Sequence, residues 1–285
     1  MIVLGANQYG KAEIRLLRVD RTEPAHALHD LNVTVTLSGA FEATHLTGDN
    51  TAVLTTDAQK NTVFALAAEH GVGQIEDFAL RLAGHFVASQ PPVTRARVAV
   101  EEYAWVPAGG TGHSFARAGG ELRTAMVTRD GDGATIVSGL RDLVLLNTKG
   151  SEFWGFARDK YTTLAESKDR ILATAVNARW RHAEPAADWS ASHQMARDLL
   201  ISAFAQTYSY SLQQTLYAMG KRLLEGLPSV AEVRLSLPNK HHFDVDMSPF
   251  GVDSTGEVFY AQDRPYGLIE GTVLRDDTSP SAEVW

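Results

Sequence analysis

The stretch Leu31-Asn-Val-Thr-Val-Thr-Leu37 decides the fold class of this chain, because its apolar and polar residues alternate. This period of two predicts a β-strand with one face in a core and the other toward solvent. We expect the strand to span residues 29–44. A strand at residues 11–20 precedes it, and the connection through Pro24 makes the two an antiparallel pair.

The same order of predicted elements occurs twice along the chain. Residues that cap or break helices mark their ends, such as Thr56-Asp57 before the first helix and Pro91-Pro92 after the second. In the first half we predict helices at 58–70 and 74–89 and strands at 93–105 and 113–117; in the second half, strands at 122–128, 134–148 and 169–181, helices at 188–207 and 211–225, and strands at 231–237 and 257–261. The repeat predicts an α+β fold of antiparallel sheets with helices on one face.

This repeat also predicts the domain organisation. We place the boundary at Gly119-Gly120, which gives a first domain at 1–119 and a second at 120–275. The tail at 276–285 matches neither domain and is expected to be mobile. Sheets of this kind have open edges, and a closed ring of several copies would remove those edges and enclose a tunnel.

Composition excludes several classes of protein. The 285 residues include no cysteine, which excludes disulfides, iron–sulfur clusters, thiolate zinc sites and a cysteine nucleophile. The net charge of −8 argues against nucleic acid or an anionic membrane as a partner. The uncharged run at 199–220 is too polar to span a membrane, and neither a signal peptide nor a terminal Ser-Lys-Leu is present. We therefore expect a cytoplasmic protein.

Common cofactor motifs are missing from the sequence. No Gly-x-Gly-x-x-Gly follows a predicted strand, and there is no P-loop. His242, Asp244 and Asp246 would share one face of a strand and could hold a metal, but a polar face toward solvent is the commoner arrangement. The missing motifs argue against flavin, nicotinamide and nucleoside triphosphate cofactors.

Six groups of motifs, in order along the chain, resemble the signatures of the urate oxidase (uricase) family. They are Tyr9-Gly-Lys11; Thr56-Asp57 with Lys60-Asn-Thr62; Phe153-Trp-Gly-Phe156 with 158–164; Asp169-Arg-Ile-Leu172; Ser211-Leu-Gln213 with Thr215-Leu-Tyr217; and Ser236-Leu-Pro-Asn-Lys-His241 with 257–259 and 267–269. Each is short, but together they cover nearly the whole chain. Leu212 and His242 depart from the residues expected in many relatives.

The resemblance implies two tandem tunnelling-fold (T-fold) domains that assemble as a homotetramer around a tunnel. It implies oxidation of urate by O₂ and water to 5-hydroxyisourate and hydrogen peroxide, with neither a metal nor an organic cofactor. By motif, the catalytic residues would be Lys11, Thr56 and His241, and the substrate-binding residues Thr56, Asp57, Phe153, Leu164, Arg170, Leu212, Gln213 and Asn239. In the family, the Lys/Thr and Arg/Gln segments meet across a subunit interface.

The chemistry of these residue types suits a flat, anionic, amide-like ring. The Arg170 fork can hold a carbonyl and neutralise charge, and Gln213 at a helix start offers both a donor and an acceptor. The Leu212 backbone N–H adds a donor at the same helix start. Phe153 can stack on the substrate ring, and Leu164 shapes the wall of the pocket.

The proton transfers suit the remaining residues. Lys11 is a strong base only if burial or a neighbouring cation lowers its pKa. Thr56 and His241 could relay the proton, and Asn239 could hold O₂ and then water without carrying charge.

Three alternatives stay open from the sequence. One is a T-fold enzyme that acts on a pterin-like heterocycle, although its zinc-dependent members typically use a cysteine ligand that this chain lacks. A second is a non-catalytic purine-binding protein, which would keep Phe153, Arg170 and Gln213 but lose Lys11 or Thr56. A purely structural oligomer would leave the ordered motifs unexplained.

Overall fold

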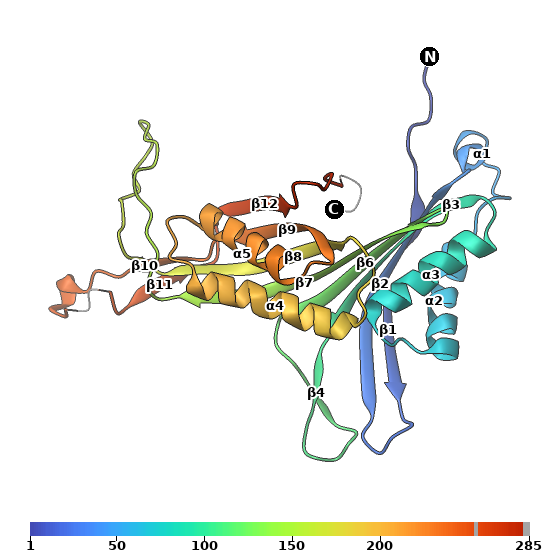
Figure 1. The fold of residues 1–285 in the computed structure, drawn as a ribbon, viewed down its shortest axis with the longest axis horizontal. Helices are drawn as coiled ribbons and strands as arrows, with labels where there is room; N and C mark the ends of the chain where they lie inside the picture. Colours follow the sequence, from blue (N-terminus) through green and yellow to red (C-terminus); the bar gives the residue numbers. More distant parts are fainter. Residues whose placement is uncertain (254–255, 282–285) are drawn as a thin grey trace. The chain divides into compact units, whose positions relative to one another are not determined.

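The computed structural model describes residues 1–253 and 256–281 (Figure 1). The strands are β1 (Tyr9–Asp20), β2 (Ala27–Gly39), β3 (Val93–Tyr103), β4 (Trp105–Pro107), β5 (Phe115–Arg117), β6 (Leu122–Asp130), β7 (Gly133–Asn147), β8 (Leu172–His182), β9 (Val230–Pro238), β10 (His241–Asp244), β11 (Phe259–Gln262) and β12 (Leu268–Leu274). The helices are α1 (Glu42–Leu46), α2 (Thr56–His70), α3 (Ile75–Ser89), α4 (Trp189–Gln206), α5 (Leu212–Gly226) and a short 3₁₀ helix, η1 (Ser248–Phe250). The α+β class predicted from the sequence is confirmed.

The chain forms two compact units, which divide between Gly139 and Leu140 inside β7. Unit 1 contains residues 1–139 and 184–190, and unit 2 contains residues 140–183 and 191–280. The domain boundary predicted at 119–120 was placed from the repeated order of elements, and it stays a prediction.

Unit 1 has the strand order β1-β2-β3-β6, with antiparallel pairs throughout, and β7 follows β6. The alternation of apolar and polar residues at 31–37 explains its core. Leu31, Val33 and Val35 of β2 are at most 1% exposed and belong to one apolar cluster with residues of α2 and α3, such as Val63 and Phe78. Both helices therefore cover the face of the sheet to which these side chains point.

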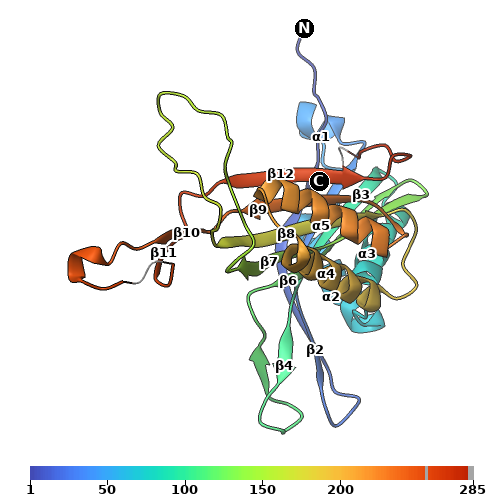
Figure 2. The same ribbon diagram turned by 60° about the vertical axis from the view of Figure 1, so that its left-hand side comes forward.

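Unit 2 has the strand order β7-β8-β9-β12, with its own apolar core. Figure 2 shows α5 lying along β12 and β9, the strands against which it packs. The contact is close at Gly220 of α5, where an added Cβ would lie 2.6 Å from Val273 of β12. Trp180 of β8 and Met219 of α5 are both fully buried in this core.

The structure differs from the predicted elements in several places. β2 ends at Gly39 rather than at residue 44, and the five-residue helix α1 follows with Phe41 buried before it. The strand predicted at 113–117 forms as β5, but it pairs with β4 in a separate two-stranded sheet, and β6 lies beside β3. β6 takes that place because it alternates buried residues such as Ala125 and Val127, whereas β5 buries none.

The end of the chain also differs from the prediction. The strand predicted at 257–261 forms β11, which pairs with β10 in a separate ribbon. β12, which the sequence analysis missed, pairs with β9 from Leu268 to Leu274. In the predicted tail, the Arg181 Nη2 donates to the Ser279 carbonyl at 3.3 Å, while residues 282–285 lie outside the described part of the chain.

Within residues 1–253 and 256–281, two non-glycine residues have positive φ, and each lies in a strand that begins a run of two strands followed by helices. Glu13 in β1 has φ 55°, and its N–H donates to the Thr34 hydroxyl at 3.1 Å. Asp142 in β7 has φ 60°, and its N–H donates to the Asn177 side chain at 3.1 Å. The β1 register shifts between Lys11 and Ile14, so Lys11 lies directly before a bulge.

No helix in the described ranges has the length and apolarity that crossing a membrane requires.

Candidate active site

A cavity of about 480 Å³ in unit 2 brings together most of the site residues predicted from the sequence. Its walls include Phe153, Leu164, Arg170, Leu212, Gln213, Asn239 and His241. These residues come from the segment between β7 and β8, from the first turn of α5, and from the end of β9 and the start of β10. Residues far apart in the sequence therefore converge on one cavity.

Backbone pairing holds Phe153 at the wall of this cavity. The N–H of Phe153 donates to the Ser167 carbonyl at 2.8 Å, and the Ser167 N–H donates back at 2.9 Å. The neighbouring Glu152 N–H donates to the Ser209 carbonyl at 2.7 Å. Phe156 stacks on Phe153 with ring centroids 5.0 Å apart, so the ring's orientation is supported from one side.

Ser151 holds Arg170 by two hydrogen bonds. The backbone N–H of Arg170 donates to the Ser151 carbonyl at 3.0 Å, and its Nε donates to the Ser151 hydroxyl at 3.3 Å. The guanidinium carbon also lies 5.0 Å from the centroid of the Phe153 ring. Burial lowers the pKa of Arg170, but an arginine remains a cation. Because the Arg170 Nε already donates to Ser151, the two Nη atoms are the part of the guanidinium available to a ligand.

The first turn of α5 supplies backbone donors. Ser211 caps the helix by accepting from the Gln214 N–H at 3.2 Å, so Leu212 and Gln213 are the first two helical residues. N–H groups at such positions have no partner within the helix, and the helix dipole favours an anion there. Behind this turn, the buried Thr215 hydroxyl donates to the buried Ser209 hydroxyl at 2.8 Å. A fixed helix start is therefore one wall of the cavity.

Asn239 and His241 come from the chain as it leaves β9. The Asn239 N–H donates to the Gly267 carbonyl at 2.8 Å, and Asn239 bridges to Thr174 of β8. His241 stacks on Phe243 with centroids 5.8 Å apart. Burial lowers the pKa of His241, and the positive charge of Arg170 lowers it further, so the neutral imidazole is the favoured form at pH 7.

Lys11, Thr56 and Asp57 lie in unit 1, and none of them lines the unit 2 cavity. Thr55, rather than Thr56, is the N-cap of α2, since its hydroxyl accepts from the Ala58 N–H at 3.1 Å. Thr56 is then the first helical residue.

The motif residues around Lys11 and Asp57 fix the geometry of unit 1 locally. The hydroxyl of Tyr9 donates to the Leu54 carbonyl at 3.1 Å, which ties β1 to the loop before α2. The Asp57 carboxylate accepts from Lys60 Nζ at 2.6 Å and from the Asn61 amide at 3.0 Å. Lys60, and to a smaller extent Lys11, lowers the pKa of Asp57.

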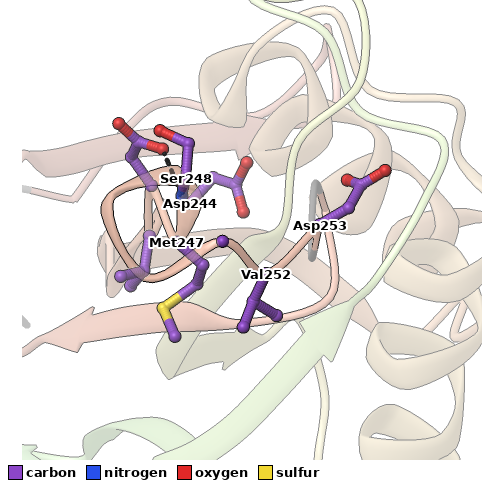
Figure 3. A pocket seen from close by; sticks show the side chains of 8 residues that line it. Asp244, Met247, Ser248, Val252 and Asp253 are labelled. Carbon is purple, nitrogen blue, oxygen red and sulfur yellow. Dashed lines mark hydrogen bonds between the residues drawn. The ribbon is translucent and has the colours of Figure 1, made fainter.

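A second cavity of about 480 Å³ contains none of the residues predicted to bind urate or to act in catalysis (Figure 3). It is lined by Asp244, Asp246, Asp253 and their neighbours, and Figure 3 shows Asp244, Ser248 and Asp253 around it. Asp246 accepts from the Ser248 N–H at 2.9 Å. Asp244 accepts from the Gly256 N–H at 3.1 Å. The strand face predicted for His242, Asp244 and Asp246 does not form, because β10 ends at Asp244. In the described ranges no group of three histidine or acidic residues could hold a metal ion.

Ser151, Ser209 and Thr215, the buried hydroxyl residues behind the cavity, were given no role from the sequence, although Thr215 belongs to one of the family motifs. Only their positions just before Phe153 and around Gln213 could have pointed to them. Their burial, at most 1% exposed, is a property of the folded chain.

The chain matches known proteins along almost its whole length. A family model described as uricase matches residues 7–128 and 136–270. The uricase of Arthrobacter globiformis is 49% identical over 284 residues, covering 100% of this chain and 94% of the relative. The uricase of Dictyostelium discoideum is 39% identical and covers 96% of this chain and 98% of the relative.

Solved structures agree with these matches. The crystal structure of the Arthrobacter globiformis uricase has a TM-score of 0.96 at 49% identity, covering 100% of this chain and 99% of that chain. A uricase from Bacillus fastidious has a TM-score of 0.80 at 25% identity, covering 96% and 95%. The resemblance found in the sequence motifs is confirmed, and the chain belongs to the uricase family.

Proposed function

We propose that this protein is a cofactor-independent urate oxidase. It converts urate, O₂ and water to 5-hydroxyisourate and hydrogen peroxide, a reaction in which urate loses two electrons and O₂ gains them. The observation that carries the proposal is the unit 2 cavity, where Arg170, Gln213, Phe153, Asn239 and His241 converge in a chain of the uricase family. The reaction belongs to urate degradation, within purine metabolism.

In the proposed complex, the urate anion lies on Phe153 and is held at two edges. The Arg170 Nη atoms donate to a ring carbonyl and neutralise charge, which a bidentate guanidinium does well. The Leu212 N–H and the Gln213 side chain bind the opposite amide edge, where the helix dipole also favours an anion. Leu164 closes the wall of the cavity and excludes water.

Proton transfer is assigned to Lys11, Thr56 and His241. In the proposed relay, Lys11 acts together with Thr56 to remove a proton from urate or from the attacking water, and His241 completes the relay. The lowered pKa of His241 supports this role, because a neutral imidazole can accept a proton near pH 7. Asn239 holds O₂ and then water beside the ring. Deprotonated urate is electron-rich enough to reduce O₂ directly, so the protein supplies deprotonation, position and charge stabilisation.

We further propose a homotetramer of tandem T-fold domains, in which one subunit brings Lys11, Thr56 and Asp57 to the cavity of another. The repeated order of elements and the matching positive-φ residues, Glu13 and Asp142, support the tandem arrangement. The cavity walls come from unit 2 alone, which supports completion by residues of a partner. The cytoplasmic location expected from the sequence stays a prediction.

Urate consumption by the metal-chelated protein tests the proposal. We expect urate's ultraviolet absorbance to fall with an equal molar uptake of O₂. Lys11→Ala should be at least a hundredfold slower while it still binds urate, since general-base catalysis contributes about 10²–10⁴-fold. Lys221→Ala, on the exposed side of α5, is the matched control.

Two results would contradict the proposal. Tight urate binding without turnover by the unaltered chain would favour the non-catalytic purine-binding protein. Turnover of a pterin, with no binding of urate, would favour the other T-fold enzyme.

A further inference from the structure

The face of the unit 1 sheet that points away from the core contains a small polar cavity. It measures about 160 Å³ and is lined by Gln8, Thr36, Ser38, Arg95 and Arg97. In the register of β2 and β3, Thr36 lies opposite Arg97 and Ser38 lies opposite Arg95. The cavity is therefore built on two paired strands, and none of its residues belongs to the proposed active site.

Arg95 and Arg97 are two residues apart on β3, so both point to the same face. Arg97 is half-buried, and its Nε donates to the Met126 sulfur at 2.9 Å, which is a weak acceptor. Over residues 1–253 and 256–281, no carboxylate lies within 4.0 Å of the Arg97 guanidinium. The residue opposite Arg97 on β6 is Thr128, whereas Asp130 lies opposite Arg95.

The electrostatics of Arg97 are unfavourable without a nearby counter-charge. Burial lowers the pKa of Arg97, and the positive charge of Arg95 lowers it further. Partial burial of the Arg97 guanidinium near a second cation, with the Met126 sulfur as its acceptor, costs free energy. A bound anion would remove this cost.

We propose that this cavity binds a small tetrahedral oxyanion, such as sulfate or phosphate. Arg97 offers its planar fork for a bidentate contact, and Arg95 adds a second positive charge. The Thr36 and Ser38 hydroxyls and the Gln8 amide are additional donors around the same space. A volume of about 160 Å³ admits one such ion and is too small for a nucleotide.

Calorimetric titration of the full chain with sodium sulfate tests binding directly. Sodium chloride at matched ionic strength is the reference, and sulfate stays below about 20 mM because higher concentrations stabilise proteins non-specifically. We expect saturable binding of sulfate, and a rise in Tm of about 2–5 °C at ten times Kd. Equal effects of chloride and sulfate would overturn the proposal.

Variants locate the site. Arg97→Met should weaken sulfate binding at least tenfold, and Arg97→Lys, which keeps the charge but loses the fork, should have an intermediate affinity. Arg129→Met is the matched control, because Arg129 lies on β6, bonds the Gly131 carbonyl and is absent from the cavity. Unchanged sulfate affinity in Arg97→Met would overturn the proposal.

A milder substitution keeps the test decisive if Arg97→Met fails to fold. Thr36→Val preserves the shape of the β2 side chain but removes a hydroxyl donor, so sulfate affinity should fall several-fold. Circular dichroism and urate oxidation verify that each variant is folded. Sulfate binding unchanged by both Thr36→Val and Arg97→Lys would contradict the assignment.

Discussion

Arg170 shows how the chemistry of one residue depends on a neighbour that carries no charge. The Ser151 hydroxyl occupies the Arg170 Nε, so it decides which edge of the guanidinium meets a ligand. Ser151 is 1% exposed, and water cannot readily replace its hydroxyl. Ser151 is thus a positioning residue for Arg170, whose own contact with urate is part of the proposed function.

Ser151→Ala should raise KM for urate about tenfold and change kcat less, because it loosens a substrate-binding cation rather than the proton relay. The loss of one buried hydrogen bond to a charged group, about 1.5–3 kcal/mol, sets this scale. Steady-state kinetics separate the two constants. Ser202→Ala is the control, since the Ser202 hydroxyl donates within α4 to the Leu199 carbonyl. Equal falls in kcat for both variants would contradict the positioning role.

His182 predicts a pH dependence of stability. It is 6% exposed, and burial lowers its pKa to about 4 from an ordinary value of 6.5. Since the unfolded chain takes up this proton at higher pH, stability is full above about pH 6.5 and falls as the pH drops toward 4. The loss amounts to roughly 2–3 kcal/mol.

Urea unfolding at pH 7.5 and pH 5 measures this effect. The difference between the two free energies should be smaller in His182→Gln than in the unaltered chain. His70→Gln, at an exposed position, should keep the full difference. A difference that His182→Gln leaves unchanged would mean that other groups cause the acid sensitivity.

At the scale of elements, Gly10 shows how tightly β1 and β2 approach beside Lys11. A Cβ at Gly10 would lie 1.9 Å from the Val35 carbonyl oxygen, a contact that only movement of the β2 backbone could relieve. Gly84, inside α3, has no atom within 4 Å of such a Cβ. The two glycines therefore predict opposite responses to the same substitution.

Gly10→Ala should destabilise the chain by about 2 kcal/mol or more and reduce urate oxidation, because β1 carries Lys11. Gly84→Ala should stabilise it by about 0.5–1 kcal/mol through helix propensity. Urea unfolding curves of both variants give the comparison. A Gly10→Ala variant as stable as Gly84→Ala would contradict the close approach of the strands.

At the scale of the whole molecule, the proposed shared site predicts complementation between inactive variants. If Lys11 of one subunit serves the Arg170 of another, mixed oligomers of Lys11→Ala and Arg170→Ala chains contain some sites with both native residues. Random mixing of equal amounts restores about a quarter of the sites.

Co-expression of the two variants with different affinity tags, followed by tandem purification, gives the mixed species. Each variant alone should remain inactive. Mixed oligomers without urate oxidation would contradict a site made by two subunits, while the unaltered chain's activity would still stand as the test of the reaction itself.

Much of the fold could be predicted from local sequence. The alternation in β2 and β3, the capping residues of α2 and α5, and the glycine-rich turn between β6 and β7 all act within a few residues. Predicted helix ends therefore agree with the structure to within two residues, as for 74–89 against Ile75–Ser89. β12 was missed because its Glu270 and Gly271 interrupt the apolar pattern, and its pairing with β9 supplies the order.

The sequence by itself determined the α+β class, the family, and the residue types available for the proposed reaction, because periodicity, caps and ordered motifs are local properties. Tertiary structure alone decided that β6 rather than β5 lies beside β3. It also decided that Ser151 holds Arg170, and that Arg95 and Arg97 line one cavity with Thr36. The physical reason is that each of these depends on hydrogen bonds, burial or charge between residues distant in the chain, and no local pattern specifies which distant partner a residue meets.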